Sequence, residues 1–332
     1  MRKGAQDRER TAAQVFVEAF VGEGPVLLAG DHQGFAGAGL TASGHEVERW
    51  SRWSGPLGPG TAWPVGGPYP SAALRIPKEK PALDLALHAL AAHLTVGGVV
   101  WIYGANDEGI RSVAKRLSPL YVDVRSISVK RHCRVLRAVR AEGVEPKAPL
   151  DAWRVTGELE LDGVVLPWIR YPGVFAKGRL DAGTEILLGV IGAPPEGARV
   201  LDFACGTGVI AACLARRTPS AAVTLSDADA LAVESARANV PDGSITLGDT
   251  WDQICPGPYD WIVSNPPIHV GKAEDHRVLH ALIQGAPARL TEGGQLWLVV
   301  QRRVMPETAL QASFRRVRRV HQSGRFSVWC AQ

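Results

Sequence analysis

Short, mainly apolar runs alternate with longer amphipathic stretches through the second half of the chain. The short runs indicate buried strands, and the stretches between them have the length and spacing of helices. Regular alternation of strand and helix predicts a mostly parallel sheet with helices on both faces. The predicted strands are Arg199–Phe203, Ala222–Leu225, Ser244–Leu247, Tyr259–Ser264 and Gln295–Val300, and the predicted helices are Val209–Arg216, Ala228–Asn239 and Ala273–Leu290.

The last two predicted strands, Phe314–Val320 and Arg325–Cys330, are separated by only four residues. So short a connection cannot hold a crossover helix, so this pair is predicted to be antiparallel. Five parallel strands followed by an antiparallel pair is the layout of class I methyltransferases. An ordinary dinucleotide-binding domain lacks the final hairpin.

The first half of the chain repeats features of the second. Leu94-Thr-x-Gly-Gly-x-x-Trp101 recurs as Leu290-Thr-x-Gly-Gly-x-x-Trp297, and an apolar helical stretch precedes each copy. Such an internal repeat predicts a duplicated domain. The predicted fold class is α/β, with two tandem class I methyltransferase (Rossmann-like) domains. The N-terminal one is degenerate, and the C-terminal one is catalytic and ends in the antiparallel hairpin.

A segment rich in Pro, Gly and charge, residues 141–150, predicts the boundary between the domains. The predicted domains are residues 1–145, a degenerate methyltransferase-like domain for RNA binding or structural support, and residues 146–332, the catalytic domain. After the boundary, Asp162-Gly163 separates two alternating runs. This pair predicts a hairpin, because both turn residues need positive φ.

Composition is that of a globular protein, with 46% apolar and 21% charged residues. No run of 18 or more apolar residues is present, so no membrane span is expected. The first residues lack the apolar core of a secretion signal. The five cysteines are scattered and form no C-x-x-C pair, which indicates reduced thiols. We therefore expect a cytoplasmic location.

Positive charge is concentrated in two segments, although the net charge is only +4. Nine Lys or Arg and one acid lie between Arg111 and Arg140, and seven Arg and one acid lie between Arg302 and Arg325. Such segments suit a polyanionic partner, because each cation that meets a phosphate releases condensed counterions. Solvated surface charge without a partner is the alternative.

A glycine loop at the end of the first strand of the C-terminal half, residues 200–208, is the candidate cofactor site. Its glycines permit positive φ and leave room for a ligand beside the backbone. The helix that follows begins with unpaired N–H groups. As a bare pattern, Gly206-x-Gly208-x-x-Ala211 also fits a dinucleotide site.

Carboxylates at three successive strand ends favour S-adenosylmethionine as the cofactor. Asp202 can hold its cationic amino-acid end, Asp227 can accept the ribose hydroxyls, and Asp249 can accept the adenine amino group. The alternatives are a helix cap for Asp227 and a turn for Asp249. Cys205 is interpreted as a small loop residue rather than a nucleophile. The predicted cofactor-binding residues are Asp202, Ala204, Cys205, Gly206, Gly208, Asp227, Ala228, Asp249, Thr250 and Asn265.

Ser264-Asn265-Pro266-Pro267 directly follows the fourth strand and is the most specific motif of the chain. An amine attached to a purine ring is a poor nucleophile, because its lone pair is delocalised. The side-chain oxygen of Asn265 and the carbonyl of Pro266 can accept its two N–H groups. They would orient the lone pair and stabilise positive charge on the nitrogen. The predicted catalytic residues are Asn265, Pro266 and Pro267, and no metal is required.

These motifs resemble those of the ribosomal RNA small subunit methyltransferase C family of guanine-N2 methyltransferases. The resemblance rests on Tyr171–Phe175, Leu180–Thr184, the loop at Asp202 and Asn265-Pro-Pro-x-His269, and in the first half on Ile76–Pro81, Tyr103–Ser112 and Arg131–Arg134. It thus covers nearly the whole chain. It implies methylation of one guanine N2 in 16S ribosomal RNA, as free RNA or in the 30S particle, with the N-terminal domain helping to hold RNA.

The resemblance also implies four substrate-binding residues. Phe175 and Asp181 would lie near the cofactor and the target, and Ile268 and His269 follow the catalytic motif. Ile268 stands where the family usually has an aromatic residue that would stack on the flipped base. Ile can pack on a base face but stacks less well.

The N-terminal copy lacks the predicted site. Leu28 stands opposite Asp202, and the end of the fourth strand, Leu74-Arg-Ile-Pro-Lys, carries no Asn-Pro-Pro. We expect this domain to be retained for RNA binding or for structural support.

Other functions stay open at this point. The Ser264-Asn265-Pro266-Pro267 motif could equally methylate a guanine of large-subunit RNA, adenine N6 or a protein glutamine, because the same two oxygens can bind each amine or amide. A dinucleotide-dependent reductase would use the glycine loop, and a non-catalytic RNA-binding factor would use the basic segments alone. His276 and His280 share a predicted helix face, but no third ligand is indicated, so no metal is predicted. The oligomeric state is not determined by the sequence.

Overall fold

A computed structural model describes residues 2–332 except 176–178, 255, 268, 271–272 and 275. The chain divides into two compact units, Met1–Arg154 (unit 1) and Val155–Gln332 (unit 2). The division falls after residue 154, whereas the linker composition predicted it after residue 145. The reason is Trp153, which packs edge-on against His88 with 5.1 Å between ring centroids and donates its indole N–H to the carbonyl of Lys147. Residues 146–154 therefore belong to unit 1.

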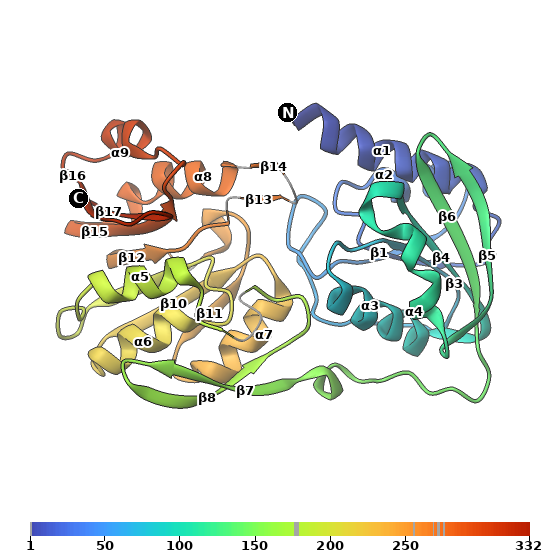
Figure 1. Ribbon diagram of the computed structural model, residues 1–332, viewed down its shortest axis with the longest axis horizontal. Coiled ribbons are helices and arrows are strands. Elements are labelled where there is room, and N and C mark those ends of the chain that lie inside the picture. The colour runs from blue at the N-terminus through green and yellow to red at the C-terminus, as the bar shows by residue number, and fades with distance from the viewer. Residues whose placement is uncertain (1, 176–178, 255, 268, 271–272, 275) are drawn as a thin grey trace. The chain divides into compact units, whose positions relative to one another are not determined.

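Unit 1 contains a mixed sheet in the order β2-β1-β3-β4-β6-β5 (Figure 1). Strands β1 to β4 are parallel, and β6 and β5 are antiparallel to their neighbours. Helix α1 packs on β4 and β6, where Phe16 stacks on Tyr103 with ring centroids 4.4 Å apart. The strands are β1 (Val26–Ala29), β2 (Val47–Trp50), β3 (Tyr69–Arg75), β4 (Leu94–Ala105), β5 (Tyr121–Lys130) and β6 (Cys133–Arg140), and the helices are α1 (Arg2–Ala19), α2 (Phe35–Ala42), α3 (Lys80–His93) and α4 (Ala114–Leu117).

Unit 2 contains a sheet in the order β11-β10-β9-β12-β15-β17-β16, preceded in the chain by a separate hairpin, β7–β8 (Figure 1). Its strands are β7 (Val155–Leu161), β8 (Val164–Arg170), β9 (Arg199–Phe203), β10 (Ala222–Asp227), β11 (Ser244–Leu247), β12 (Tyr259–Ser264), β13 (His269–Val270), β14 (Ala273–Glu274), β15 (Leu290–Gln301), β16 (Val317–Gln322) and β17 (Phe326–Ala331), and its helices are α5 (Ala182–Val190), α6 (Val209–Arg217), α7 (Ala230–Asn239), α8 (Arg277–Gly285) and α9 (Glu307–Ser313).

Alternate residues of the central strands of unit 2 face opposite sides of the sheet, as strand geometry requires. Val200 and Val263 pack in the core formed with α5, α6 and α7, whereas Leu201 and Ile262 pack in the core formed with α8 and α9. β9, β10, β11, β12 and β15 are parallel, and β17 and β16 form the antiparallel pair. The predicted fold class and its final hairpin are confirmed.

One predicted helix is wrong in its extent. The helix predicted over Ala273–Leu290 begins only at Arg277 and ends at Gly285. Its first residues instead form β14, which pairs with β13 in an antiparallel ladder. Its last residues follow Pro287, which has no N–H to continue an α-helical ladder.

The pairing of neighbouring strands has the same register in the sheet of unit 1 as in the sheet of unit 2. Ala73 of β3 pairs with Leu28 and Trp101, and Val263 of β12 pairs with Asp202 and Trp297. Both pairs of strands show a register shift at the corresponding place, after Tyr69 in β3 and after Tyr259 in β12. The register therefore supports the duplication inferred from the sequence repeat, and it places Arg75 of unit 1 in the position of Asn265.

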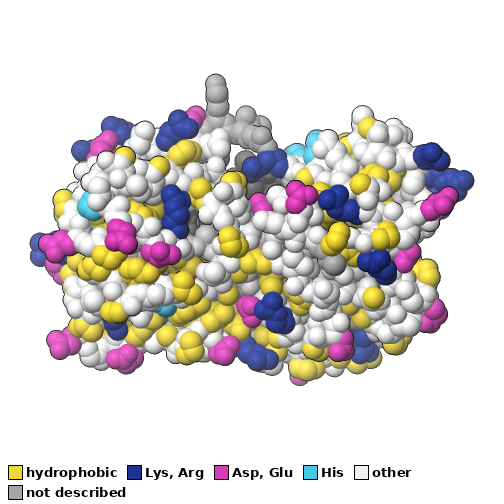
Figure 2. All heavy atoms as spheres, turned by 180° about the vertical axis from the view of Figure 1, so that it is seen from behind, with side chains coloured by type: hydrophobic (Ala, Val, Ile, Leu, Met, Phe, Trp, Pro, Cys, Tyr) yellow, Lys and Arg dark blue, Asp and Glu magenta, His cyan; other side chains and the backbone are white. Residues whose placement is uncertain are grey.

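On the face drawn in Figure 2, Lys and Arg side chains stand in separate groups with Asp and Glu among them. None of the described helices has the length and apolar character needed to cross a membrane.

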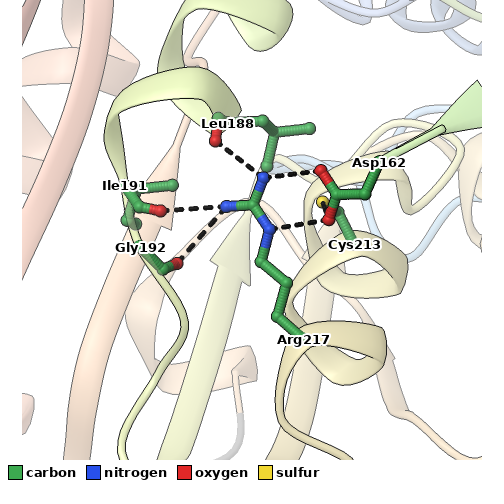
Figure 3. A network of polar contacts seen from close by, with 6 residues as sticks. All are labelled: Asp162, Leu188, Ile191, Gly192, Cys213 and Arg217. Atoms are coloured by element: carbon green, nitrogen blue, oxygen red, sulfur yellow. Dashed lines mark hydrogen bonds and ion pairs between the residues drawn. The ribbon is translucent and has the colours of Figure 1, made fainter.

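Hairpin β7–β8 is attached to unit 2 through Arg217 at the end of α6 (Figure 3). Its turn residues Asp162 and Gly163 have φ of 49° and 77°, as the Asp-Gly pair predicted. The Arg217 guanidinium pairs with both carboxylate oxygens of Asp162 at 2.7 and 2.8 Å, and it also donates to the carbonyls of Leu188 and Ile191 at the end of α5. One side chain thus fixes the hairpin to two helices.

Candidate active site

The predicted site residues follow strands β9, β10, β11 and β12, at the carboxyl edge of the sheet where open α/β folds bind ligands. β9 lies between β10 and β12 in the sheet. The buried hydroxyl of Ser264 donates to the carbonyl of Phe203 over 2.6 Å. This bond holds the start of the Asn-Pro-Pro motif against the start of the glycine loop.

The glycine loop turns through three residues with positive φ, namely Ala204 at 57°, Gly206 at 56° and Gly208 at 84°. A Cβ at Gly208 would lie 3.0 Å from Val240, so glycine is required there for packing at the start of α6. A Cβ at Gly206 would meet no heavy atom within 4 Å. Gly206 therefore borders open space, which leaves room for a ligand beside the backbone.

Asp202 is a fully buried carboxyl group at the end of β9. Its Oδ2 accepts the N–H of Ala211 over 3.0 Å, whereas its Oδ1 has no hydrogen-bond partner among the described residues. Burial raises the pKa of this carboxyl to about 7. One oxygen thus holds the first turn of α6, and only Oδ1 remains for the cationic end of the predicted cofactor. A buried carboxyl whose second oxygen has no partner among the described residues fits a site that a cation completes.

Asp227 holds the loop rather than capping a helix. Its Oδ2 accepts the N–H of Gly206 over 2.8 Å, and its Oδ1 accepts the N–H of Asp229 over 2.9 Å. The cap of α7 is Asp229, whose side chain accepts from Leu231. Because each carboxylate oxygen has two lone pairs, Asp227 can still accept ribose hydroxyls. Ala228 is partly exposed beside it.

Asp249 and Thr250 lie exposed after β11. The backbone N–H of Asp249 donates to the side chain of Gln253 over 2.9 Å, so the residue does sit in a turn. Its carboxylate makes no hydrogen bond or ion pair within the described chain, so its predicted contact with adenine stays a prediction. Burial raises the pKa of the Cys205 thiol well above its usual range, which agrees with a small loop residue and not a nucleophile.

The side-chain amide of Asn265 is held in one orientation. Its Nδ2 donates to Asp181 Oδ2 over 2.8 Å and to Thr184 Oγ1 over 3.0 Å. A carboxylate can only accept, so the amide nitrogen must be the atom that faces Asp181. Oδ1 accepts no hydrogen bond from the described residues. The oxygen predicted to receive the target amine is therefore both unused and oriented by its neighbours.

The rest of the catalytic motif is described in part. Pro266 is buried and Pro267 is exposed. Ile268, predicted to lie against the target base, is outside the described residues. The backbone of His269 begins β13, but its side chain is outside the described residues too.

The two other predicted substrate residues differ in their surroundings. Phe175 is 62% exposed, which leaves its ring available to a partner. Asp181 is the N-cap of α5, because the Oδ2 that holds Asn265 also accepts the N–H groups of Gly183 and Thr184 at 2.9 and 3.2 Å. The structure thus assigns Asp181 a positioning task that the resemblance did not include, and its contact with substrate stays a prediction.

Known proteins match this chain in both units. A methyltransferase small domain family model matches residues 166–330, and a methyltransferase small domain N-terminal model matches residues 59–154. A ribosomal RNA small subunit methyltransferase C from Hahella chejuensis is 36% identical over 277 residues, which are 81% of this chain and 79% of that protein. The chain belongs to the ribosomal RNA small subunit methyltransferase C family. It is an S-adenosylmethionine-dependent methyltransferase.

A second relative and a solved structure also match this chain. The ribosomal RNA small subunit methyltransferase C of Pseudomonas aeruginosa is 40% identical over 237 residues, which are 70% of each protein. The solved structure of a 16S rRNA N2 methyltransferase from T. thermophilus, in complex with AdoMet and guanosine, matches with a TM-score of 0.84 at 22% identity. That match covers 97% of this chain and 91% of the other, so the two proteins share a fold throughout.

In this member of the family, the glycine loop is also held by residues that no motif singled out. The buried indole N–H of Trp168 in β8 donates to Thr207 Oγ1 over 3.1 Å. Asn239 at the end of α7 donates to the carbonyls of Thr207 and Ile169, at 3.0 and 2.8 Å. A tryptophan in a strand and an asparagine at a helix end are ordinary in sequence, so only the structure identifies this clamp.

The corresponding end of the sheet in unit 1 is filled by its own side chains. Arg75, in the position of Asn265, donates from Nη2 to both carboxylate oxygens of Glu108 at 2.6 and 2.7 Å. Asp31 in the loop after β1 accepts the N–H groups of Ala36 and Gly37. This family member therefore carries a methyltransferase fold in unit 1 without the Asn-Pro-Pro motif, which agrees with a degenerate copy.

A metal site is not formed within the described part of the chain, where no group of three His, Cys, Asp or Glu side chains could hold an ion. His276 lies at the start of α8, and its ring centroid is 6.4 Å from that of His280.

Proposed function

We propose that this protein transfers a methyl group from S-adenosylmethionine to N2 of a guanine in 16S ribosomal RNA of the small subunit. The observation that carries the proposal is the side-chain amide of Asn265, whose Oδ1 is oriented and accepts no hydrogen bond from the described residues. The bond from Ser264 to Phe203 holds its motif against the start of the glycine loop. The names of its relatives and the guanosine in the T. thermophilus structure support the choice of base and RNA.

Cofactor binding rests on the loop after β9. Oδ1 of Asp202 would hold the cationic amino-acid end, Asp227 would accept the ribose hydroxyls, and the backbone at Gly206 leaves the space. S-adenosylmethionine supplies a methyl group that its sulfonium already activates, so the protein need not form a covalent intermediate.

The Asn-Pro-Pro motif then acts on the target amine. Asn265 Oδ1 and the Pro266 carbonyl would accept the two N–H groups of guanine N2 and turn its lone pair toward the methyl donor. As charge develops on the nitrogen, these two oxygens stabilise it. Asn265 accepts without keeping the proton, so the amine can release it after transfer. Asp181 and Thr184 keep the amide from rotating.

The proposal also covers the role of unit 1 and the cellular location of the protein. We propose that unit 1 supports the catalytic unit or binds RNA, as its retained fold without the catalytic motif suggests. We keep a cytoplasmic location as part of the proposal, because a ribosomal RNA substrate lies in the cell interior.

The proposal is tested on small ribosomal subunits from cells that lack this protein. We expect mass spectrometry of their 16S RNA to show one missing N2-methylguanine, and purified enzyme with labelled S-adenosylmethionine to restore it. Label in large-subunit RNA, in N6-methyladenine or in protein glutamine would instead support one of the alternative substrates.

The role of Asn265 is tested in the same assay. Asn265→Ala should lower kcat by about 10²–10³-fold, the cost of one oriented charge-stabilising group. Any change in cofactor affinity, measured by calorimetry, should be much smaller. Unchanged methylation by this variant would remove Asn265 from the mechanism.

A further inference from the structure

Most arginines of the C-terminal basic segment make no ion pair with the described acids. The segment from residue 302 to residue 325 contains seven arginines and a single acid, Glu307. Six of the arginines are exposed and make no ion pair with an Asp or Glu of the described residues. We call these six the arginine edge: Arg302, Arg315, Arg316, Arg318, Arg319 and Arg325.

The N-terminal basic segment, which is also rich in Lys and Arg, differs in this respect. Arg125 and Arg137 share Asp123 at 2.6 and 3.4 Å, and Lys130 and Arg131 share Glu18 at 4.0 and 3.1 Å. Arg116 pairs with Asp84 at 2.6 Å in the same segment. Three acids of unit 1 thus pair with five of the nine cations. The described residues provide no such acid for the arginine edge, which leaves its charge to an outside partner.

The arginine edge begins beside the catalytic motif. The N–H of Arg302 donates to the carbonyl of Arg325 over 2.8 Å, which joins the end of β15 to the turn before β17. The guanidinium of Arg325 lies 5.6 Å from the ring of Phe326, and a Cβ at Gly183 would lie 3.1 Å from that ring. Gly183 donates its N–H to Asp181, the residue that holds Asn265. One end of the arginine edge is therefore linked by contacts to the catalytic side chain.

From there the arginine edge follows β16, the outermost strand of the sheet (Figure 1). Arg318 lies opposite Cys330 and Arg319 opposite Trp329, so their side chains flank the open edge on both faces. The guanidinium of Arg319 is 5.5 Å from the Trp329 ring, which limits its freedom before a partner binds. Six residues of strand span about 20 Å, enough for several consecutive phosphates.

The same strand is poorly suited to pairing with another protein strand. Its ladder with β17 shifts register between Arg319 and His321, and such irregularities bend an edge strand. Charged side chains along an edge also oppose strand addition. The partner that fits unpaired guanidinium groups is one with repeated negative charge, because Arg binds phosphate with parallel hydrogen bonds.

We propose that the arginine edge is the surface on which the catalytic unit grips the RNA backbone that flanks the target nucleotide. The inference rests on the proposed function and adds where the RNA is held. Its direction is also specified: the backbone leaves the catalytic motif past Arg325 and runs along β16.

The test compares two triple variants that remove equal charge. Arg318→Gln/Arg319→Gln/Arg325→Gln takes three cations from the arginine edge, and Arg125→Gln/Lys130→Gln/Arg131→Gln takes three acid-paired cations from unit 1. Binding of each protein, with S-adenosylmethionine present, to 16S RNA is measured over a series of KCl concentrations. Methyl transfer to small subunits gives kcat and KM in parallel.

For the arginine-edge variant we expect the slope of log Kd against log salt to fall by about two, as the loss of three phosphate contacts to single-stranded RNA requires. The KM for the subunit should rise at least tenfold, with kcat and cofactor affinity unchanged. The unit 1 variant should change the slope by less than one. The charge-keeping variant Arg318→Lys/Arg319→Lys/Arg325→Lys should recover the wild-type slope, and so exclude loss of folding as the cause.

Equal slope changes in both glutamine variants, or none in the arginine-edge variant, would overturn the inference. Binding of the same variant to vesicles of anionic lipid is measured as well. The inference would also be overturned if the variant lost vesicle binding while its binding to 16S RNA was unchanged. These outcomes leave guanine methylation by the wild-type protein intact. Failure of the wild-type protein to methylate guanine in 16S RNA would instead refute the proposed function, whatever the variants bind.

Discussion

Substitutions at Asp181 can separate the capping of α5 from the positioning of Asn265. Oδ2 of Asp181 accepts three hydrogen bonds, from the N–H groups of Gly183 and Thr184 and from Nδ2 of Asn265. Asp181→Ala removes all three. Asp181→Ser keeps a hydroxyl that can cap the helix but is one bond too short to reach Asn265 as well. Asp181→Asn keeps an acceptor oxygen in the place of Oδ2.

The three variants should therefore differ in two measured quantities. Loss of the cap costs about 0.5–2 kcal/mol, so only Asp181→Ala should lose that much stability. Loss of the bond to Asn265 frees its amide to rotate, and misplacement of a reacting partner by about 1 Å can cost on the order of 10²-fold in rate. We expect Asp181→Ala and Asp181→Ser to lower kcat roughly 10- to 100-fold, with Asp181→Asn close to wild type.

Methyl transfer to small subunits that lack the modification gives kcat, calorimetry gives cofactor affinity, and urea unfolding gives stability. Cofactor affinity should stay within about threefold, because Asp181 holds the amide and not the glycine loop. A fully active Asp181→Ser protein would show that Asp181 is a helix cap alone, and the reasoning about Asn265 would be wrong.

Three further predictions concern the surroundings of the site. Burial raises the pKa of Asp202 to about 7, so between about pH 4 and pH 7 the folded protein holds a proton that the unfolded chain has released. The free energy of unfolding should therefore fall as pH rises through that window, by up to about 1.4 kcal/mol per pH unit from this group. Urea unfolding of Asp202→Asn should lack that pH dependence. Arg217→Ala should cost about 2–4 kcal/mol of stability at pH 7, from lost hydrogen bonds to Asp162 and the end of α5. Arg217 lowers the pKa of Asp162 to about 2, so this loss should shrink as pH falls from about 4 toward 2, which urea unfolding at low pH would check. Gly206→Ala should mainly weaken S-adenosylmethionine binding, whereas Gly208→Ala should mainly lower the melting temperature, because only the Cβ at Gly208 would meet packed atoms. Equal effects of the two variants on calorimetric affinity and on melting temperature would contradict this prediction.

Much of the fold follows from local pattern. The bounds of β9, β11 and β12 agree with the prediction, because a short apolar run closed at both ends by turn residues is typical of a buried strand. The Asp162-Gly163 turn was predictable because few residue pairs accept positive φ at both positions. The helix predicted over Ala273–Leu290 was wrong where strand pairing and Pro287 opposed the local pattern.

The chemistry of the site was predictable only as a set of residue types. The sequence identifies Asn265, Asp202 and the glycines, because their spacing along the chain is itself the signal. It does not show that the Asn265 amide is held by a residue 84 positions earlier. Nor does it show that Trp168 and Thr207, 39 positions apart, meet behind the loop. Such contacts depend on the register of strands and the packing of helices.

The two basic segments also separate what the sequence determines from what the tertiary structure decides. Their composition is set by the chain alone and predicts a polyanionic partner for both. Whether each cation meets an acid was decided by the tertiary structure, which places Glu18 and Asp123 beside one segment and leaves the arginine edge unpaired. The physical reason is that a local sequence pattern reflects the backbone conformation that each residue prefers. Charge pairing, burial and the orientation of an amide depend instead on neighbours that only folding brings within a few ångströms.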